Sequence, residues 1–230
     1  MIPIDSLIRS NRKTIALIIT SDGKLVVRAP LRASRAQIDK LISEKTAWIH
    51  AHQVEVLARP RPVLKSFKEG ESFFFLGQAY PIHFSTNGIT GLELRAGAFW
   101  MPSSEPDRAA AAFTAWYQRQ ARAVFAERLH LQAARLGLQP AALRITAART
   151  RWGSCSSRGS ISFTWRLVMA PVEVIDYVVV HECIHLVVKN HSKTFWDRVA
   201  AAYPAYLDAK RWLRENNGLG IEFLSQTKKG

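Results

Sequence analysis

The chain has 230 residues, of which 48% are hydrophobic, which is enough apolar material for one large core or two smaller ones. It contains only two cysteines, Cys155 and Cys183, so we exclude a disulfide framework and expect a reducing, cytoplasmic setting. No apolar run reaches the roughly eighteen residues of a membrane-spanning helix, and Met1–Asp5 lacks the features of a secretory signal, so we expect no membrane partner.

The formal net charge is +14 at pH 7, with 32 basic residues against 18 acidic ones. The basic residues are spread along the chain, so a nucleic-acid partner is possible but is not indicated by a clustered basic patch. A diffuse basic surface favours acidic or phosphorylated substrates over basic ones.

The N-terminal part of the chain carries strand and helix signals in alternation. Ile15–Ile19 and Leu25–Val27 flank a glycine-containing turn, which predicts a β-hairpin. Ser34 has a glutamine three residues later, Gln37, and this capping box predicts the start of a helix. Apolar residues keep helical spacing up to Ile49, so we expect one continuous helix there.

A proline-rich segment at residues 59–62 is a stiff break between this piece and the rest of the chain. Short strands are expected beyond it, at residues 72–76, 80–84, 92–95 and 99–101. We therefore group residues 1–102 as an N-terminal β-rich region with a capping helix.

Residues 103–230 are expected to form a helical catalytic domain with a small antiparallel sheet, which makes the whole chain an α+β fold. A long helix that stops at Gly137 carries an apolar stripe, and we expect it to form the layer beneath the catalytic helix. A strand at 143–147 precedes a hairpin of 151–155 with 161–167, and the second hairpin strand offers an exposed edge to an extended peptide.

The pattern H-E-x-x-H runs from His181 to His185, on a helix predicted from Val172 to about Lys189. At about 100° per residue the two histidines lie about 40° apart on one helix face, as two imidazole ligands of a single zinc ion require. Glu182 leans off the same edge, where its carboxylate reaches a metal-bound water without becoming a ligand. A metal-free buried helix is the alternative, and it would need buried partners for all three side chains, which is costly.

A third ligand is available from His191 only if the helix ends first, because in a continuous helix His191 would lie about 240° round from His185. Asn190 tolerates the left-handed conformation that ends helices, and Ser192 is suited to cap the next helix. We therefore predict that the chain turns at Asn190 and brings His191 back to the metal.

Two further motifs accompany this pattern. Arg151–Ser157 reads R-W-G-S-C-S-S, and Asn190–Trp196 reads N-H-S-x-x-F-W. Together with the residues that lead from Val174 into H-E-x-x-H, these motifs make the chain resemble the YgjP-like family of bacterial metal-dependent hydrolases, distant relatives of the SprT-like zinc metallopeptidases.

The resemblance implies a zincin-like catalytic domain with one Zn²⁺ per chain. The metal ligands are then His181, His185 and His191, and Glu182 is the catalytic base. Cys183 stands where family members usually carry leucine, and it lies about 200° round the helix from His181, so we expect it to be buried and not to be a ligand.

The leading functional prediction is a zinc metallopeptidase, in which a zinc-bound water activated by Glu182 attacks a peptide carbonyl. Arg151 is the candidate donor to the developing oxyanion, and a structural ion pair is the alternative role for it. Two other functions stay open. A nucleoside triphosphate (pyro)phosphohydrolase would use the basic surface to gather phosphates, and a DNA-associated protein with a structural zinc would need a fourth ligand that the sequence does not offer.

Overall fold

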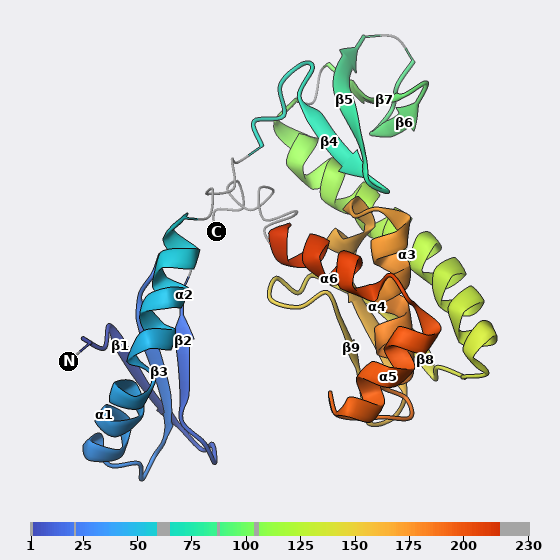
Figure 1. Cartoon of the computed structure of the whole chain (residues 1–230). Coiled ribbons are helices and arrows are strands. Elements are labelled where there is room, and N and C mark those ends of the chain that lie inside the picture. The colour runs from blue at the N-terminus through green and yellow to red at the C-terminus, as the bar shows by residue number, and fades with distance from the viewer. Residues whose placement is uncertain (1, 21, 59–64, 87, 104–105, 217–230) are drawn as a thin grey trace. The chain divides into compact units, whose positions relative to one another are not determined.

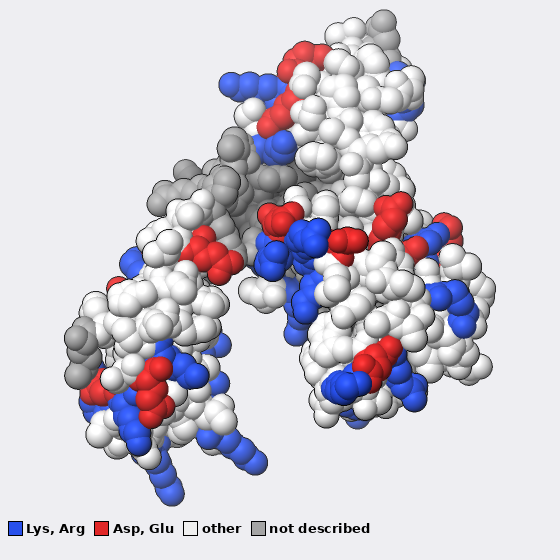
Figure 2. Space-filling view, viewed as in Figure 1, with Lys and Arg blue, Asp and Glu red and all other residues white. Residues whose placement is uncertain are grey.

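The computed structural model describes residues 2–20, 22–58, 65–86, 88–103 and 106–216, and the chain divides into two compact units, Met1–Arg61 and Pro62–Gly230 (Figure 1). The expected break at residues 59–62 lies outside the described residues. A division between residues 102 and 103 would fall inside the second unit. On the face shown in Figure 2, basic and acidic side chains are interspersed over both units.

The first unit is a three-stranded sheet with two helices. Its strands are β1 (Ser6–Ser10), β2 (Ala16–Ile19) and β3 (Leu25–Pro30), in the order β1-β3-β2, with β1 parallel and β2 antiparallel to β3. The predicted hairpin of β2 and β3 is thus confirmed. Alternate residues of β3 face the helices and form a small core with apolar residues of α1 and α2 (Leu25, Val27, Ala29, Ile38, Ile42 and Ile49).

The predicted capping box at Ser34 is confirmed. The Ser34 hydroxyl accepts the N–H of Gln37 at 3.2 Å, and the Gln37 side chain accepts the N–H of Ser34 at 2.9 Å. The prediction of one continuous helix was wrong, because the chain forms two helices here, α1 (Arg35–Glu44) and α2 (Thr46–Ala58). The Thr46 hydroxyl donates to the carbonyls of Ile42 and Ser43, which satisfies groups that the end of α1 leaves open.

The second unit begins with a four-stranded sheet that packs on a long helix. The strands are β4 (Ser72–Phe75), β5 (Gln78–Ser85), β6 (Glu93–Arg95) and β7 (Ala98–Pro102), in the order β4-β5-β7-β6. After the short 3₁₀ helix η1 (Pro106–Arg108), α3 spans Ala109–Leu136 and ends at Gly137, whose φ of 65° is left-handed as the predicted helix stop requires. Aromatic rings join sheet and helix, because Phe73 stacks on Phe113 at 4.1 Å between ring centroids.

The turn after β4 also contacts residues 168–171, which precede the helix that begins at Val172. The N–H of Leu76 donates to the carbonyl of Val168, and the N–H of Gly77 to that of Met169. Gly77 has a φ of 81°, and a Cβ there would meet Pro171 at 2.9 Å, so the turn can approach only as glycine. These contacts make residues 72–102 part of the same core as the helices that follow.

The second sheet of this unit follows α3 in the sequence and has three strands. They are β8 (Ala142–Thr146), β9 (Gly153–Cys155) and β10 (Ser160–Thr164), in the order β8-β10-β9. The hairpin of β9 and β10 is confirmed, but the sheet is mixed and not antiparallel, because β8 runs parallel to β10. The predicted strand at 161–167 was too long, since it ends at Thr164 and continues as the 3₁₀ helix η2 (Trp165–Met169). β10 is therefore the central strand, and β9, which contacts α4, has no strand partner on its outer edge among the described residues.

Three helices complete the unit: α4 (Val172–Ile184), α5 (Lys193–Ala202) and α6 (Tyr206–Glu215). As predicted, α3 packs against α4, and the two helices are also joined by an ion pair in which the Arg128 guanidinium holds both carboxylate oxygens of the buried Asp176. The chain thus has the predicted α+β class. No helix in the described part of the chain is long and apolar enough to cross a membrane.

We predict that Asp176→Ala lowers the free energy of unfolding by about 3 kcal/mol, because the guanidinium of Arg128 would lose its partner in a partly buried setting. The control is Asp197→Ala, which removes an exposed i,i+4 pair with Lys193 and should cost no more than about 0.5 kcal/mol. Urea unfolding of both variants gives the comparison. Equal losses would mean that the α3–α4 pair is no stronger than a surface ion pair.

Candidate metal centre

The C-terminal end of α4 carries two of the predicted ligands. His181 lies in its last turn and His185 occupies the C-cap, with helical φ and ψ of −63° and −13°. The helix therefore ends four to five residues before the predicted end at Lys189. The N–H groups of Leu186 and Val188 bond to the carbonyls of Cys183 and Ile184, both at 2.9 Å, so a tight turn terminates the helix directly after the second histidine.

The turn to His191 differs from the prediction in detail. Asn190 is not left-handed, because the non-glycine residues with positive φ in the described part of the chain are Phe67, Leu76 and Ala96. Instead, the Asn190 side-chain oxygen accepts the N–H of Ser192 at 3.3 Å and so forms a local turn. Ser192 does occupy the N-cap position of α5, but its side chain makes no capping bond.

The structure brings the three histidines together. The Nε2 atom of His191 lies 3.2 Å from Nε2 of His185 and 3.1 Å from Nε2 of His181. Ligands of a tetrahedral zinc with Zn–N bonds of about 2.05 Å lie about 3.3 Å apart, so this spacing fits one ion. The three side chains are the one group of three or more potential metal-binding side chains among the described residues, and each offers a nitrogen within 4.8 Å of the others.

Hydrogen bonding and burial prepare the imidazoles as ligands. Nδ1–H of His185 donates to the carbonyl of Val188 at 2.9 Å, which fixes the tautomer that leaves a lone pair on Nε2. Burial lowers the pKa of His181 to about 3, with smaller effects of His185, His191 and Lys210, and burial also lowers the pKa of His185. Both rings are therefore neutral at physiological pH, as metal binding requires.

Aromatic side chains of α5 hold the rings in place. Phe195 is fully buried and stacks on His185 with 4.4 Å between ring centroids, while its edge meets His181 at 4.8 Å. Trp196 stacks on His191 at 5.7 Å. The F-W pair of the N-H-S-x-x-F-W motif thus packs directly against the candidate ligands.

Glu182 is 6% exposed and lies beside the cluster without belonging to it. Burial raises the pKa of its carboxyl group to about 7, and the positive charge of Arg151 opposes this shift. Arg151 is exposed and has no hydrogen bond or ion pair with the described residues, so the structural ion pair considered for it is not formed there. Cys183 is fully buried and outside the cluster, as expected.

Gly153 is a site residue that sequence reasoning missed. A Cβ at this position would lie 2.7 Å from both Cγ and Oε1 of Glu182, so the carboxylate side chain fits only because residue 153 is glycine. The available signal was the R-W-G-S-C-S-S motif, but its glycine has no visible role until β9 is folded against α4.

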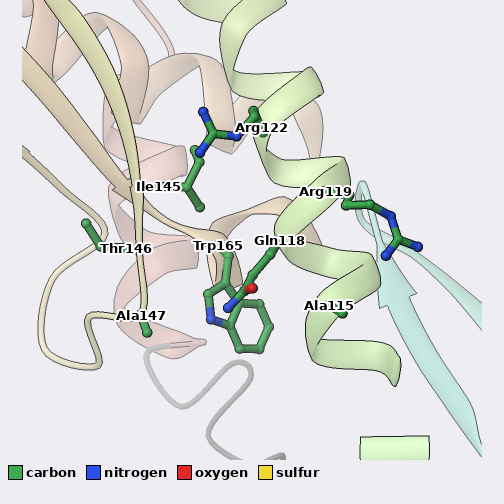
Figure 3. Close-up of a pocket in the computed structure, with 8 residues that line it drawn as sticks. All are labelled: Ala115, Gln118, Arg119, Arg122, Ile145, Thr146, Ala147 and Trp165. Atoms are coloured by element: carbon green, nitrogen blue, oxygen red, sulfur yellow. The ribbon is translucent and has the colours of Figure 1, made fainter. Parts of the chain in front are cut away.

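A cavity of about 540 Å³ elsewhere in the second unit shares no residue with this cluster. It lies between α3, β8 and Trp165, where Arg122 extends over Ile145 and Arg119 points away from the cavity (Figure 3). Its position gives it no part in the chemistry of the histidines.

We predict that Gly153→Ala reduces kcat/KM of the hydrolytic activity by about 100-fold while metal content stays unchanged, because the new methyl group displaces the Glu182 carboxylate and not the histidines. Gly91→Ala is the matched control, since a Cβ there meets nothing within 4 Å. Activity assays and metal analysis of both variants test this. Full activity of Gly153→Ala would show that the position of Glu182 is unimportant.

A second prediction concerns the metal-free protein. Since the folded-state pKa of Glu182 is raised from 4.5 to about 7, its contribution to stability is lost as pH rises from about 4.5 to 7. Glu182→Gln should therefore stabilise the metal-free protein by up to about 3 kcal/mol at pH 8 and by much less at pH 4.5. Thermal unfolding in a chelator gives both values, and a gain independent of pH would contradict the buried ionisation of Glu182.

Comparison with known proteins gave one match. The family model described as YgjP-like, metallopeptidase domain, matches residues 13–216. No curated protein and no solved structure matches the chain.

Proposed function

Since the chain belongs to the YgjP-like family of metallopeptidase domains, we propose that it is a zinc peptidase that cleaves extended polypeptide segments. The observation that carries this proposal is the convergence of three imidazoles at the end of α4, next in sequence to a buried carboxylate that packs against Gly153 of the edge strand β9. The family supports the coarser assignment, a metal-dependent hydrolase, and the following arguments concern the metal and the substrate.

Zinc suits the donor set, because neutral imidazole nitrogens at this spacing match its preferred ligands and tetrahedral geometry. His181, His185 and His191 would hold the ion. When bound, zinc supplies Lewis acidity, which lowers the pKa of water and polarises a carbonyl group. No fourth His, Cys, Asp or Glu joins the cluster within the described residues, which argues for an open catalytic site over a closed structural one in a DNA-associated protein.

Glu182 is the proposed general base. Its carboxylate accepts the proton of the attacking water and later returns it to the leaving amine. In the metal-free protein, burial raises the pKa of this carboxyl group, which makes its carboxylate a stronger base than an exposed one. Gly153 lets this carboxylate lie against β9, and burial excludes the bulk water that would otherwise solvate it.

The free edge of β9 favours a peptide as substrate. The carbonyl of Trp152 and the N–H of Ser156 bond to β10, so in an antiparallel ladder the backbone groups of Gly153 and Cys155 point to the opposite edge. An extended substrate can pair with these groups by strand addition, with its scissile carbonyl near Glu182. Arg151 precedes this edge and is our candidate for stabilising the oxyanion.

Hydrolysis of nucleoside triphosphates is the second candidate, supported by the net charge of +14. Magnesium-dependent phosphoryl chemistry usually relies on carboxylate ligands, and no group of three or more His, Cys, Asp or Glu side chains other than the histidine cluster occurs among the described residues. The outer edge of β9, which a nucleotide would not use, supports a peptide as the first candidate substrate.

We predict that Glu182→Gln lowers casein hydrolysis by about 10³-fold and retains one zinc per chain, because a base is lost while the ligands stay. His191→Ala should lose both zinc and activity, whereas His130→Ala, at an exposed histidine of α3, should lose neither. Metal analysis and casein assays are run in parallel with phosphate and pyrophosphate release from nucleoside triphosphates. Release of phosphate or pyrophosphate without casein cleavage would contradict the peptidase proposal and identify the protein as a phosphohydrolase.

A further inference from the structure

Three basic side chains surround the histidine cluster without an ion-pair partner among the described residues: Arg151, Lys189 and Lys210. Lys210 is connected to the cluster through Trp196. Its Nζ lies 4.4 Å from the ring centroid of Trp196, and Trp196 stacks on His191. Exposed lysines usually move freely in solvent, so this cation–π contact gives Lys210 a defined place beside the site.

Lys189 lies on the short segment between α4 and His191, two residues before the third histidine. Its charge acts on His185 and also on Cys155 of β9, so Lys189 lies near both α4 and β9. Arg151 precedes the same edge from the other end, and its charge acts on Glu182. Arg151 and Lys189 therefore lie near β9, the edge strand with which the proposed substrate would pair.

The acidic side chains of the neighbouring helices do not compensate these charges. Asp197 of α5 binds Lys193 at 2.8 Å, and Asp208 of α6 binds Arg211 at 3.2 Å. Asp176 of α4 is held by Arg128. Glu173 lies in the first turn of α4, at the opposite end of that helix from the histidines. Glu182 is the acidic side chain that adjoins the cluster, so the charges of Arg151, Lys189 and Lys210 outnumber it there and favour negatively charged groups.

We propose that the site selects peptide segments that carry Asp or Glu within a few residues of the scissile bond, with Lys189 and Lys210 as the residues that read this charge. This rests on the proposed peptidase function and names its substrate class. Uncompensated cations beside a metal centre repel basic segments and concentrate acidic ones, and carboxylates along the substrate strand supply the partners that these lysines lack.

The test is cleavage of a mixed peptide library by the zinc-loaded, full-length protein, with cleavage sites read by mass spectrometry. Asp and Glu should be enriched near the cleaved bonds. A pair of peptides is then made from one cleaved sequence, differing only by Glu→Gln at the enriched position. The Glu peptide should have a kcat/KM about tenfold higher at low ionic strength, and the ratio should shrink as salt is added.

Charge-reversed variants assign the effect to residues. Lys210→Glu and Lys189→Glu should each lower the Glu/Gln preference at least threefold at unchanged zinc content, and the double variant should abolish it. Lys68→Glu, at an exposed lysine of the same unit outside the site, changes the net charge equally and should leave the preference unchanged. Lys210→Gln and Lys189→Gln serve as milder variants should a reversed charge impair folding.

The outcomes are distinct. A library that is cleaved without enrichment of acidic residues, or a preference that survives in the double variant, overturns this inference and leaves the peptidase intact. A wild-type protein that loads zinc and cleaves no peptide overturns the proposed function and the inference with it.

Discussion

The convergence of three imidazole Nε2 atoms at the C-terminal end of α4 is the constraint on which the second unit depends. The Nε2 atom of His191 lies 3.1 Å from Nε2 of His181 and 3.2 Å from Nε2 of His185, and one N–H group can satisfy only one of these two contacts. A shared cation would satisfy all three nitrogens at once. Three local features bring these nitrogens together: α4 ends directly after His185, the chain turns at Asn190, and Phe195 and Trp196 of α5 pack on the imidazole rings.

The surrounding fold makes the cluster rigid. α4 is almost entirely buried, and it packs on α3, which also carries the four-stranded sheet on its aromatic face. The Arg128–Asp176 pair fixes the register of the two helices, and Gly77 against Pro171 fixes the beginning of α4. Catalytic groups need to be held within fractions of an ångström, and a helix anchored at both its start and its middle meets that demand.

Much of this cluster could be predicted from sequence, because its candidate ligands follow local rules. His181 and His185 share a helix face through their i,i+4 spacing, and the need for a helix end before His191 follows from helix geometry. The capping box at Ser34 and the glycine stop of α3 are equally local. The prediction that failed concerned a pairing between strands that are distant in sequence. The parallel pairing of β8 with β10 has no turn to reveal it, so the free edge was assigned to the wrong strand.

The same reasoning explains two finer misses. The helix end at His185 depends on turn bonds and on the carbonyl of Val188, which the apolar spacing of Leu186 and Val187 hides. The role of Gly153 depends on a carboxylate from a distant part of the chain, and no local pattern encodes a contact of that kind.

X-ray absorption at the zinc edge of the purified protein tests the central claim most directly. The account predicts three imidazole nitrogens at about 2.0–2.1 Å and one oxygen from solvent, because the site must be open for catalysis. A sulfur ligand near about 2.3 Å, or a fourth ligand from a protein side chain, would show a closed structural site and contradict it.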